Sequence, residues 1–358
     1  ASIGVGAFVL SIFWRWSMER KARGAVSTGP SLFARALEAV RQPKPRYTCL
    51  GLIAVLMLVM PYISSMYQIN IMISALIYIM LGLGLNIVVG LAGQLVLGYA
   101  AFYAVGAYTY GLLNTYFGLG FWAVLPVGGI MAALFGLMLG FPVLRLKGDY
   151  LAIVTLACGE IIKTIINNLS VTGGAKGLDT SDIYADTRTL LPFAIVLIFL
   201  VVLVMMNLKT SRHGRAIMAI RDNRIAAESN GVNVTYYKLM VFVLAAFFAG
   251  MAGVLYGHTL ANIKPAMFDY NMSIEILVIV VLGGMGSIRG SIILRALPEV
   301  LRQVADYRML AYSVLLIVIM LLNSSPQFAE WKGRWSLKTL LSLGKTRKEK
   351  TKKEAAKK

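Results

Sequence analysis

The stretch GRAIMAIRDNRIAAESNGVN, residues 214–233, lies between two long apolar runs at residues 190–208 and 236–256. Each run is long enough to cross a bilayer as a helix, because a membrane span takes about 20 apolar residues. The stretch must therefore lie on one face of a membrane. The simplest interpretation is an ordinary basic cytoplasmic loop, since Lys and Arg collect in such loops.

A second interpretation of this stretch is a short helix between two stop signals. The side-chain oxygen of Asp222 or Asn223 can accept from free amides in the first turn of a following helix. Gly231 can adopt the left-handed conformation that ends a helix. The sequence thus predicts a two-turn helix over residues 224–230, which would lie along the membrane and present a surface to a protein in the cytosol.

The composition independently predicts a membrane protein. Hydrophobic residues make up 58% of the chain and charged residues only 14%, against about 25% charged in an average soluble domain. Long apolar runs with internal Gly and Pro suit helices, because barrel strands would alternate apolar and polar residues. We expect an all-α, polytopic helical membrane protein with about ten to eleven transmembrane segments. The net charge of +19 lies in loops and in the tail beside apolar helices, so nucleic acid is not an expected partner.

The order of the apolar runs predicts which loops share a face. The expected spans are residues 1–16, 47–66, 69–91, 94–117, 121–144, 150–168, 190–208, 236–258, 273–288, 291–304 and 309–322. Placing the basic loop 17–46 in the cytoplasm, as its Lys and Arg require, also places 145–149, 214–233 and the basic tail inside. Residues 169–189 and 259–272 then lie outside. The run at 291–304 carries charges, so whether it fully crosses stays open.

Four segments resemble one known family. Ile225-Ala226-Ala227, followed after three residues by Gly231, resembles the coupling loop of bacterial ABC importer permeases. Residues 81–108 (LGLGLNIVVGLAGQLVLGYAAFYAVGAY), 148–177 (beginning GDYLAIVTLACGE) and 274–290 (IEILVIVVLGGMGSIRG) resemble the same family and follow its order. The chain is similar to the M-type permease subunit of branched-chain amino acid importers. It departs from the family at Ile225, where the family's leading residue is Glu.

The resemblance implies a permease subunit of an ATP-driven importer for leucine, isoleucine or valine in the bacterial inner (cytoplasmic) membrane. It also implies a second homologous permease subunit, two cytosolic ABC ATPase subunits, a periplasmic substrate-binding protein and the lipid bilayer as partners. The chain has no Gly-x4-Gly-Lys-Ser/Thr phosphate loop, so ATP and Mg are expected on the ATPase subunits. No cofactor, metal site or catalytic residue is expected on this chain. The predicted ATPase contact consists of Arg221, Asp222, Arg224, Ile225, Ala226, Ala227 and Gly231.

These expectations divide the chain into three regions. Residues 1–46 hold a first apolar run, short for a span and expected to be truncated, and a basic cytoplasmic loop. Residues 47–323 form the helical permease domain, which includes the coupling loop 209–235. Residues 324–358 form a basic cytoplasmic tail.

The segment after residue 81 is rich in glycine. Close packing of membrane helices through small residues is one explanation. The other is that residues 90–94 (GLAGQ) break the helix and expose backbone groups to a polar ligand, as in many transporters. On the second interpretation the candidate pathway residues are Asn86, Gly90, Gly93, Gln94 and Gly98.

A second glycine-rich stretch, TGGAKG at residues 172–177, lies in a predicted outer loop. In the family that the chain resembles, this loop lies on the side where the substrate-binding protein docks. The candidate docking residues are Thr172, Gly173, Gly174 and Gly177.

Two alternative functions stay open on the sequence. An ABC permease for urea, short amides or another amino acid would share every motif above. An ion-coupled secondary transporter usually keeps an ionisable residue near the middle of the membrane, and the central parts of the spans between residues 47 and 144 contain no Asp, Glu, Lys or Arg. An intramembrane enzyme would need paired catalytic groups, which the sequence does not show.

Overall fold

The computed structural model describes residues 65–143, 146, 148–180 and 187–286. The helices are α4 (Met66–Asn86), α5 (Tyr99–Phe117), α6 (Phe121–Val143), α7 (Asp149–Asn168), α8 (Thr187–Thr210), α9 (Arg212–Asp222), α10 (Arg224–Ser229), α11 (Val234–Thr259) and α12 (Tyr270–Leu282). Shorter elements are the π-helix η1 (Ile87–Leu91), the 3-10 helices η2 (Gly174–Lys176) and η4 (Pro265–Met267), and the strands β1 (Leu178–Asp179) and β2 (Asn262–Ile263). The predicted spans at 1–16, 291–304 and 309–322, most of 47–66, and the tail lie outside the described residues.

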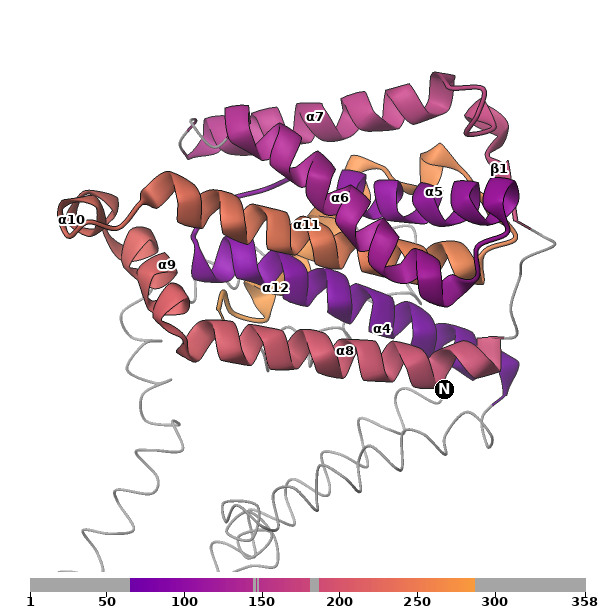
Figure 1. The fold of residues 1–358 in the computed structure, drawn as a ribbon, viewed down its shortest axis with the longest axis horizontal. Coiled ribbons are helices and arrows are strands. Elements are labelled where there is room, and N and C mark those ends of the chain that lie inside the picture. The colour runs from indigo at the N-terminus through magenta and orange to yellow at the C-terminus, as the bar shows by residue number, and fades with distance from the viewer. Residues whose placement is uncertain (1–64, 144–145, 147, 181–186, 287–358) are drawn as a thin grey trace, which may run out of the picture. The chain divides into compact units, whose positions relative to one another are not determined.

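The long helices lie side by side along the longest axis of the bundle (Figure 1). Helix α11 is central, because it contacts α4, α5 and α6. Helix α8 packs on α4, and α7 packs on α5. The short helices α9 and α10 lie at one end of the bundle and β1 lies at the other (Figure 1).

Glycines allow the central helices to approach to backbone contact. A Cβ atom added at Gly106 of α5 would lie 2.1 Å from the carbonyl oxygen of Gly250 in α11. One added at Gly253 would lie 2.2 Å from the carbonyl oxygen of Tyr103. Because neither site has room for any side chain, close packing explains part of the glycine content, as one of the two interpretations predicted.

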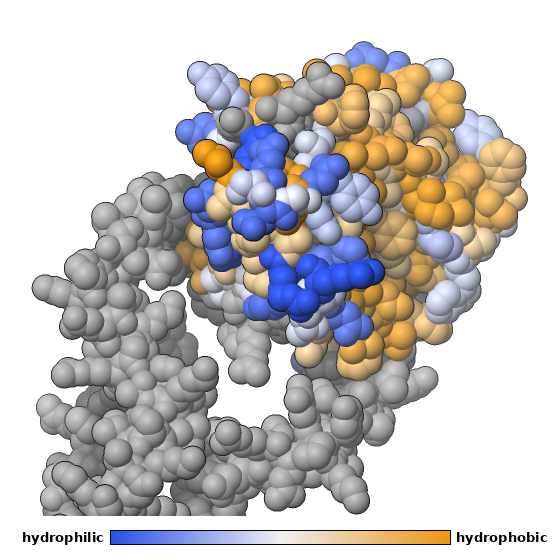
Figure 2. All heavy atoms as spheres, turned by 60° about the vertical axis from the view of Figure 1, so that its left-hand side comes forward, coloured by the Kyte–Doolittle hydropathy of each residue, from blue (hydrophilic) through white to orange (hydrophobic). Residues whose placement is uncertain are grey.

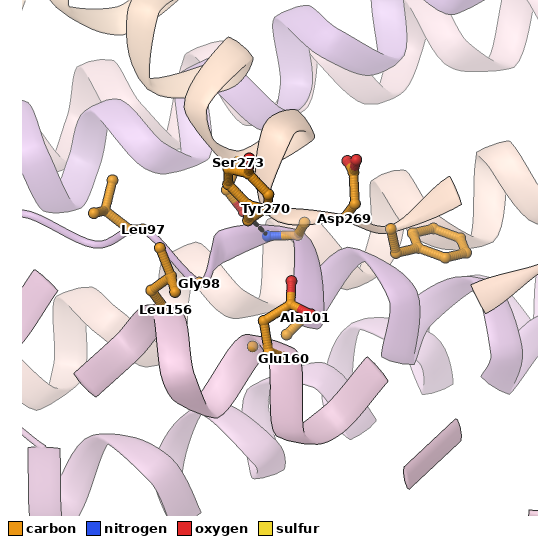
Figure 3. A pocket seen from close by; sticks show the side chains of 11 residues that line it. Leu97, Gly98, Ala101, Leu156, Glu160, Asp269, Tyr270 and Ser273 are labelled. Atoms are coloured by element: carbon orange, nitrogen blue, oxygen red, sulfur yellow. Dashed lines mark hydrogen bonds between the residues drawn. The ribbon is translucent and has the colours of Figure 1, made fainter. Parts of the chain in front are cut away.

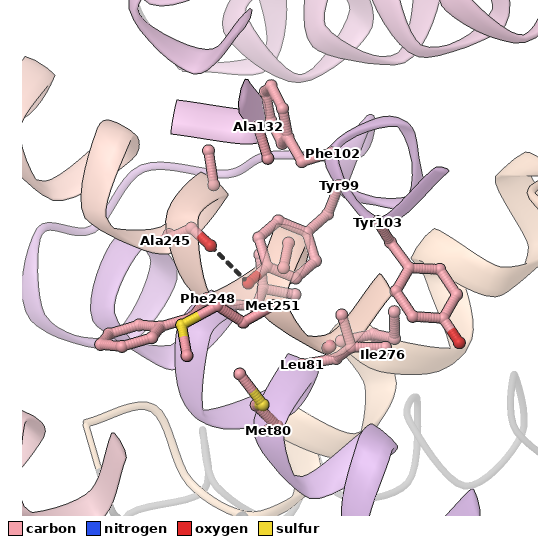
Figure 4. Close-up of a cluster of buried hydrophobic side chains, with 14 of the residues drawn as sticks. Met80, Leu81, Tyr99, Phe102, Tyr103, Ala132, Ala245, Phe248, Met251 and Ile276 are labelled. Atoms are coloured by element: carbon pink, nitrogen blue, oxygen red, sulfur yellow. Dashed lines mark hydrogen bonds between the residues drawn. The ribbon is translucent and has the colours of Figure 1, made fainter. Parts of the chain in front are cut away.

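Large side chains fill the space where α4, α5, α11 and α12 meet. Tyr99 and Tyr103 of α5 are buried beside Met80 and Leu81 of α4 and Phe248 of α11 (Figure 4). The hydroxyl of Tyr99 donates to the carbonyl oxygen of Ala245 at 3.0 Å. A buried phenol needs such an acceptor, so this bond fixes α5 against α11.

The two loops predicted to lie outside meet in the structure. Strand β1 pairs antiparallel with β2, with Leu178 opposite Ile263. Thr180 extends the contact by donating from its amide to the carbonyl oxygen of Ala261 at 2.8 Å. The predicted alternation of spans, which put both loops on one face, agrees with this pairing, and α10 lies at the opposite end (Figure 1).

The fold class is confirmed as a helical membrane protein. Within the described residues, five helical segments are long and apolar enough to span a bilayer: Met66–Leu91, Phe121–Val143, Leu190–Thr210, Val234–Thr259 and Pro265–Leu282. Helices α6, α7 and α8 expose large apolar side chains such as Met138, Ile153 and Phe199. Soluble monomers rarely expose apolar surfaces of this extent, whereas a bilayer covers them.

Two predicted spans have different ends in the structure. The span expected at 94–117 begins as a helix only at Tyr99, because the chain turns at Gly93, where φ is 66°, and residues 94–98 are not helical. The span expected at 273–288 ends at Leu282, because Gly284 and Gly286 take φ of 88° and 80°. Glycine is the residue that reaches these angles at little cost.

Candidate functional site

Helix α9 begins the polar end of the bundle directly after α8. Ser211 caps it, since the Ser211 side chain accepts from the amide of Gly214 at 3.1 Å. Its inward residues are Gly214, Ile217 and Ile220, spaced three apart. Residues 214–222 were predicted to be loop, which was wrong, because they form most of α9. The serine and the three-residue spacing were the signals that predict the helix.

Helix α10 forms as predicted. The Asn223 side chain accepts from the amide of Ala226 at 3.1 Å and caps the helix. Gly231 takes φ of 80°, and the amide of Val232 donates to the carbonyl oxygen of Ala227 at 3.1 Å. The predicted cap and the predicted left-handed stop are both confirmed, so α10 is a defined element between α9 and α11.

The two faces of α10 differ. Ala227 is 4% exposed and packs with Ile220 and Val234 in a small core of its own. Its side chain therefore supports α10 from within, which corrects the expectation that Ala227 offers it to a partner. Ile225 is 80% exposed, and Ala226 is exposed beside it. The outward face of α10 is thus apolar at its first turn.

Charge surrounds that apolar point. Between residues 209 and 231 the chain carries Lys209, Arg212, Arg215, Arg221 and Arg224 against Asp222 and Glu228. Figure 2 shows hydrophilic side chains gathered over the end of the molecule that carries α9 and α10, while the flank of the bundle is hydrophobic. The polar end is therefore basic and faces water.

The helix break predicted at residues 90–94 is present. Helix α4 passes into the π-helix η1, and the chain turns at Gly93 before α5 begins. Single π-helical turns inside α-helices are frequent at functional sites. The freed amide of Gln94 donates to the carbonyl oxygen of Val88 at 3.1 Å, and the amide of Leu97 donates to Thr155 Oγ1 at 3.1 Å.

The predicted pathway residues all lie at this break, each with its own surroundings. Asn86 is buried, and its Oδ1 accepts from the amide of Gly286 at 2.8 Å. A Cβ atom on Gly90 would lie 2.3 Å from that same amide nitrogen. Gly98 presses on α7, because a Cβ atom there would lie 1.9 Å from the carbonyl oxygen of Thr155.

Gln94 is the exception among these residues. It is 2% exposed, and neither its Nε2 nor its Oε1 has a hydrogen-bond partner in the structure. A buried amide without a partner costs about 1–3 kcal/mol. Gln94 is therefore a buried polar group at the break whose side-chain hydrogen-bonding capacity is unused.

A small cavity adjoins the break where α5, α7 and α12 meet (Figure 3). Gly98, Glu160 and Ser273 line it, together with Asp269, which caps α12. Its volume is about 10 Å³, which is room for about one water molecule. An amino acid does not fit this cavity, so a substrate route through it would need the helices to separate.

The predicted outer docking turn is folded by its own threonine. The Thr172 hydroxyl lies 2.6 Å from the carbonyl oxygen of Ile166 and 2.9 Å from that of Leu169, and its single hydrogen is donated to one of them at a time. Thr172 is 5% exposed, so its side chain is directed inward and its predicted role at the surface is corrected. Gly173 is exposed, and Gly174 and Gly177 are partly so. All three glycines have positive φ.

Sequence reasoning missed the residues that hold the break from outside. Arg221 was predicted to face a partner, yet its Nη1 donates to the carbonyl oxygen of Gly90 at 2.7 Å. Lys209 Nζ donates to the carbonyl oxygen of Gly286 at 2.9 Å. Ser273 Oγ accepts from the amide of Ala100 at 2.9 Å. No sequence pattern signals bonds between residues so far apart in the chain.

Residues 67–324 match the model of a family described as the permease component of the branched-chain amino acid transport system. The chain belongs to this family. As a member of the family it is also similar to curated relatives. It is 41% identical over 311 residues to the high-affinity branched-chain amino acid transport system permease protein LivM of Escherichia coli (strain K12). That match covers 76% of this chain and 73% of the relative.

Two further relatives of this permease carry the same name. LivM of Salmonella typhimurium is 38% identical over 298 residues, 73% of this chain and 70% of the relative. A probable LivM of Methanocaldococcus jannaschii is 30% identical over 179 residues, 47% of this chain and 52% of the relative. No solved structure matches the chain.

The stop of α10 in this permease gives a clean test, because a Cβ atom on Gly231 would meet nothing within 4 Å. Substitution there changes only the backbone preference. Gly231→Val should cost about 1–2 kcal/mol, because β-branched residues resist positive φ. Gly231→Asn is the matched control, since Asn tolerates this conformation. We expect trypsin to cut the α9–α10 segment faster in membranes that carry Gly231→Val than in those with Gly231→Asn or the wild type. Equal cutting of Gly231→Val and Gly231→Asn would contradict the account.

Proposed function

We propose that the chain is the membrane-spanning permease subunit of an ATP-driven importer of leucine, isoleucine and valine in the bacterial inner membrane. The match of residues 67–324 to the branched-chain amino acid permease family carries the proposal. The names of the relatives, high-affinity branched-chain amino acid permeases, support the substrate class. The predicted runner-up substrates, urea and short amides, have no such support.

The proposed contact with an ATPase subunit is the outward face of α10. Ile225 is 80% exposed in a surface whose other exposed residues are mostly polar or charged. Burying an isoleucine contributes about 1.5–3 kcal/mol, and apolar anchors inside a polar rim are where binding energy concentrates. Arg224 and Asp222 flank Ile225 and would form that rim. Ile225 stands where the family's leading Glu would be, so an apolar anchor replaces a charged one here.

The remaining partners are proposed from the two ends of the bundle. The basic end with α9 and α10 faces the cytosol and two ATPase subunits, which hold ATP and Mg. The end with β1, β2 and the exposed Gly173 faces a periplasmic substrate-binding protein. A second permease subunit, which the resemblance to the family implies, would complete the route. The cavity beside the break takes about one water molecule and no amino acid.

The proposed mechanism is alternating access. ATP closes the ATPase pair, the pair displaces α10, and the helices beside the break change their packing so that the route opens to the other side. An aliphatic amino acid needs a mostly apolar route with a few polar groups for its charged end. The break supplies Gln94 and free backbone groups inside a bundle whose segment from Ser65 to Phe117 carries no charged side chain.

Reconstitution tests the function directly. We expect proteoliposomes with this chain, its second permease, the ATPases and the binding protein to take up labelled leucine only when ATP is hydrolysed. Excess isoleucine and valine should compete, whereas urea and acetamide should not. Leucine uptake driven by an ion gradient without ATP would overturn the proposal in favour of a secondary transporter, and uptake of urea in place of leucine would replace the substrate class.

The anchor role of Ile225 is tested by a matched pair of variants. Ile225→Asp should lower the amount of ATPase that co-purifies with the permease by about tenfold or more, because a carboxylate in an apolar groove loses about 1.5–3 kcal/mol of burial. Ile225→Leu keeps the apolar volume and should retain the ATPase. Neither variant touches the bundle, so both should reach the membrane in wild-type amounts. Equal ATPase recovery with Asp and Leu would remove Ile225 from the contact.

A further inference from the structure

Arg221 joins the polar end of the bundle to the break in the membrane helix. It lies in the last turn of α9, just before α10. Its Nη1 donates to the carbonyl oxygen of Gly90 at 2.7 Å, across 131 residues of sequence. Its aliphatic stem lies against Gly93, where an added Cβ atom would be 2.6 Å from Arg221 Cγ. The turn of the break therefore contacts the Arg221 side chain at both Gly90 and Gly93.

The chemistry of the contact explains why a guanidinium occupies this place. Gly90 belongs to the last turn of the α4–η1 helix, where backbone carbonyls lack helical partners and carry partial negative charge. Arg221 Nη1 supplies both a donor and a positive charge. Asp222 holds the other side of the fork, with Oδ1 at 3.2 Å from Nη2 and 3.3 Å from Nε. The guanidinium is thus held between its neighbour in sequence and the break.

A second tie connects the same end of the bundle to the chain after α12. Lys209, at the end of α8, donates from Nζ to the carbonyl oxygen of Gly286 at 2.9 Å. The amide of Gly286 donates to Asn86 Oδ1 at 2.8 Å. The end of α4 and the chain after α12 are therefore held together, and each receives a cation, Arg221 from the end of α9 on Gly90 and Lys209 from the end of α8 on Gly286.

We propose that Arg221 transmits the displacement of α9 and α10 to the break between α4 and α5. This inference rests on the proposed ATPase contact. The core of Ile220, Ala227 and Val234 fixes α10 to the end of α9 and to the first residue of α11, so a partner that pulls on α10 also moves the end of α9. The hydrogen bond from Arg221 to the carbonyl oxygen of Gly90 must then either move the turn at Gly90 together with α9 or break. Arg221 is a positioning residue, because it acts through the backbone of the break and not on substrate.

A transmitting role and a purely structural role of Arg221 predict different effects of its substitution on transport. A residue that only stabilises the fold would lower the amount of transporter, its ATP hydrolysis and its uptake together. A transmitting residue lowers the leucine carried per ATP hydrolysed, while the ATPase stays bound and active. The ratio of uptake to hydrolysis therefore separates the two roles.

The test uses the assembled transporter in proteoliposomes with three variants. Arg221→Met keeps the stem beside Gly93 and removes the donor, and Arg221→Lys keeps a donor without the fork. Arg215→Met is the matched control, because Arg215 is an exposed arginine of α9 whose Nη1 donates to Thr210, away from the break. Retained ATPase, ATP hydrolysis and leucine uptake are measured per assembled complex.

We expect Arg221→Met to keep its ATPase subunits and its hydrolysis while leucine carried per ATP falls about tenfold, as loss of one charge-assisted bond implies. Arg221→Lys should fall less, and Arg215→Met should match the wild type. A wild-type ratio in Arg221→Met would overturn the inference, as would a parallel loss of uptake and hydrolysis, or failure of both Arg221 variants to assemble. If the wild-type chain itself retains no ATPase, the proposed function fails instead.

Discussion

A helix that breaks inside a membrane protein must find partners for the backbone groups that it frees, because the lipid interior offers none. The break between α4 and α5 meets this requirement with side chains from three other helices. Arg221 donates a hydrogen bond to the carbonyl oxygen of Gly90, and Thr155 Oγ1 accepts one from the amide of Leu97. Ser273 Oγ accepts one from the amide of Ala100. The positions of α7, α9 and α12 are thereby tied to one turn of backbone.

The rest of the bundle gives that turn a rigid frame. Gly106 and Gly250 bring α5 and α11 into backbone contact, and the Tyr99 bond to Ala245 locks the pair near the break. Helices packed to this density do not deform smoothly, so they move as units. At the break itself, Gln94 is buried and neither its Nε2 nor its Oε1 has a hydrogen-bond partner.

Much of the fold follows from local sequence. Apolar runs predicted the spans, and the Asn223 and Gly231 signals predicted both ends of α10. The glycines of residues 90–94 predicted the break, because helix propensity and left-handed backbone depend on nearby residues alone. Helix α9 was missed, since its four charged residues among eleven, His apart, hide a three-residue apolar spacing.

What sequence could not predict is which groups face each other. Ala227 and Thr172 lie in stretches that were predicted to face partners at the surface, yet tertiary packing buries both. Arg221 lies in a stretch predicted to be a basic surface loop, yet it donates to a carbonyl oxygen 131 positions away. Burial and long-range pairing are properties of the assembled bundle, and no periodicity or cap motif encodes them.

The central claim is that α10 and the break move as one unit, and an intramolecular distance tests it most directly. Spin labels are placed at two exposed positions, Glu228 on α10 and Met285 beside the break. The assembled transporter carries serine in place of its native cysteines. Pulsed electron paramagnetic resonance then measures the distance between the two labels. The account predicts that ATP leaves this distance unchanged in the wild type and shifts it in Arg221→Met. A shift on ATP binding in the wild type would contradict the account, since α10 would then move without the break.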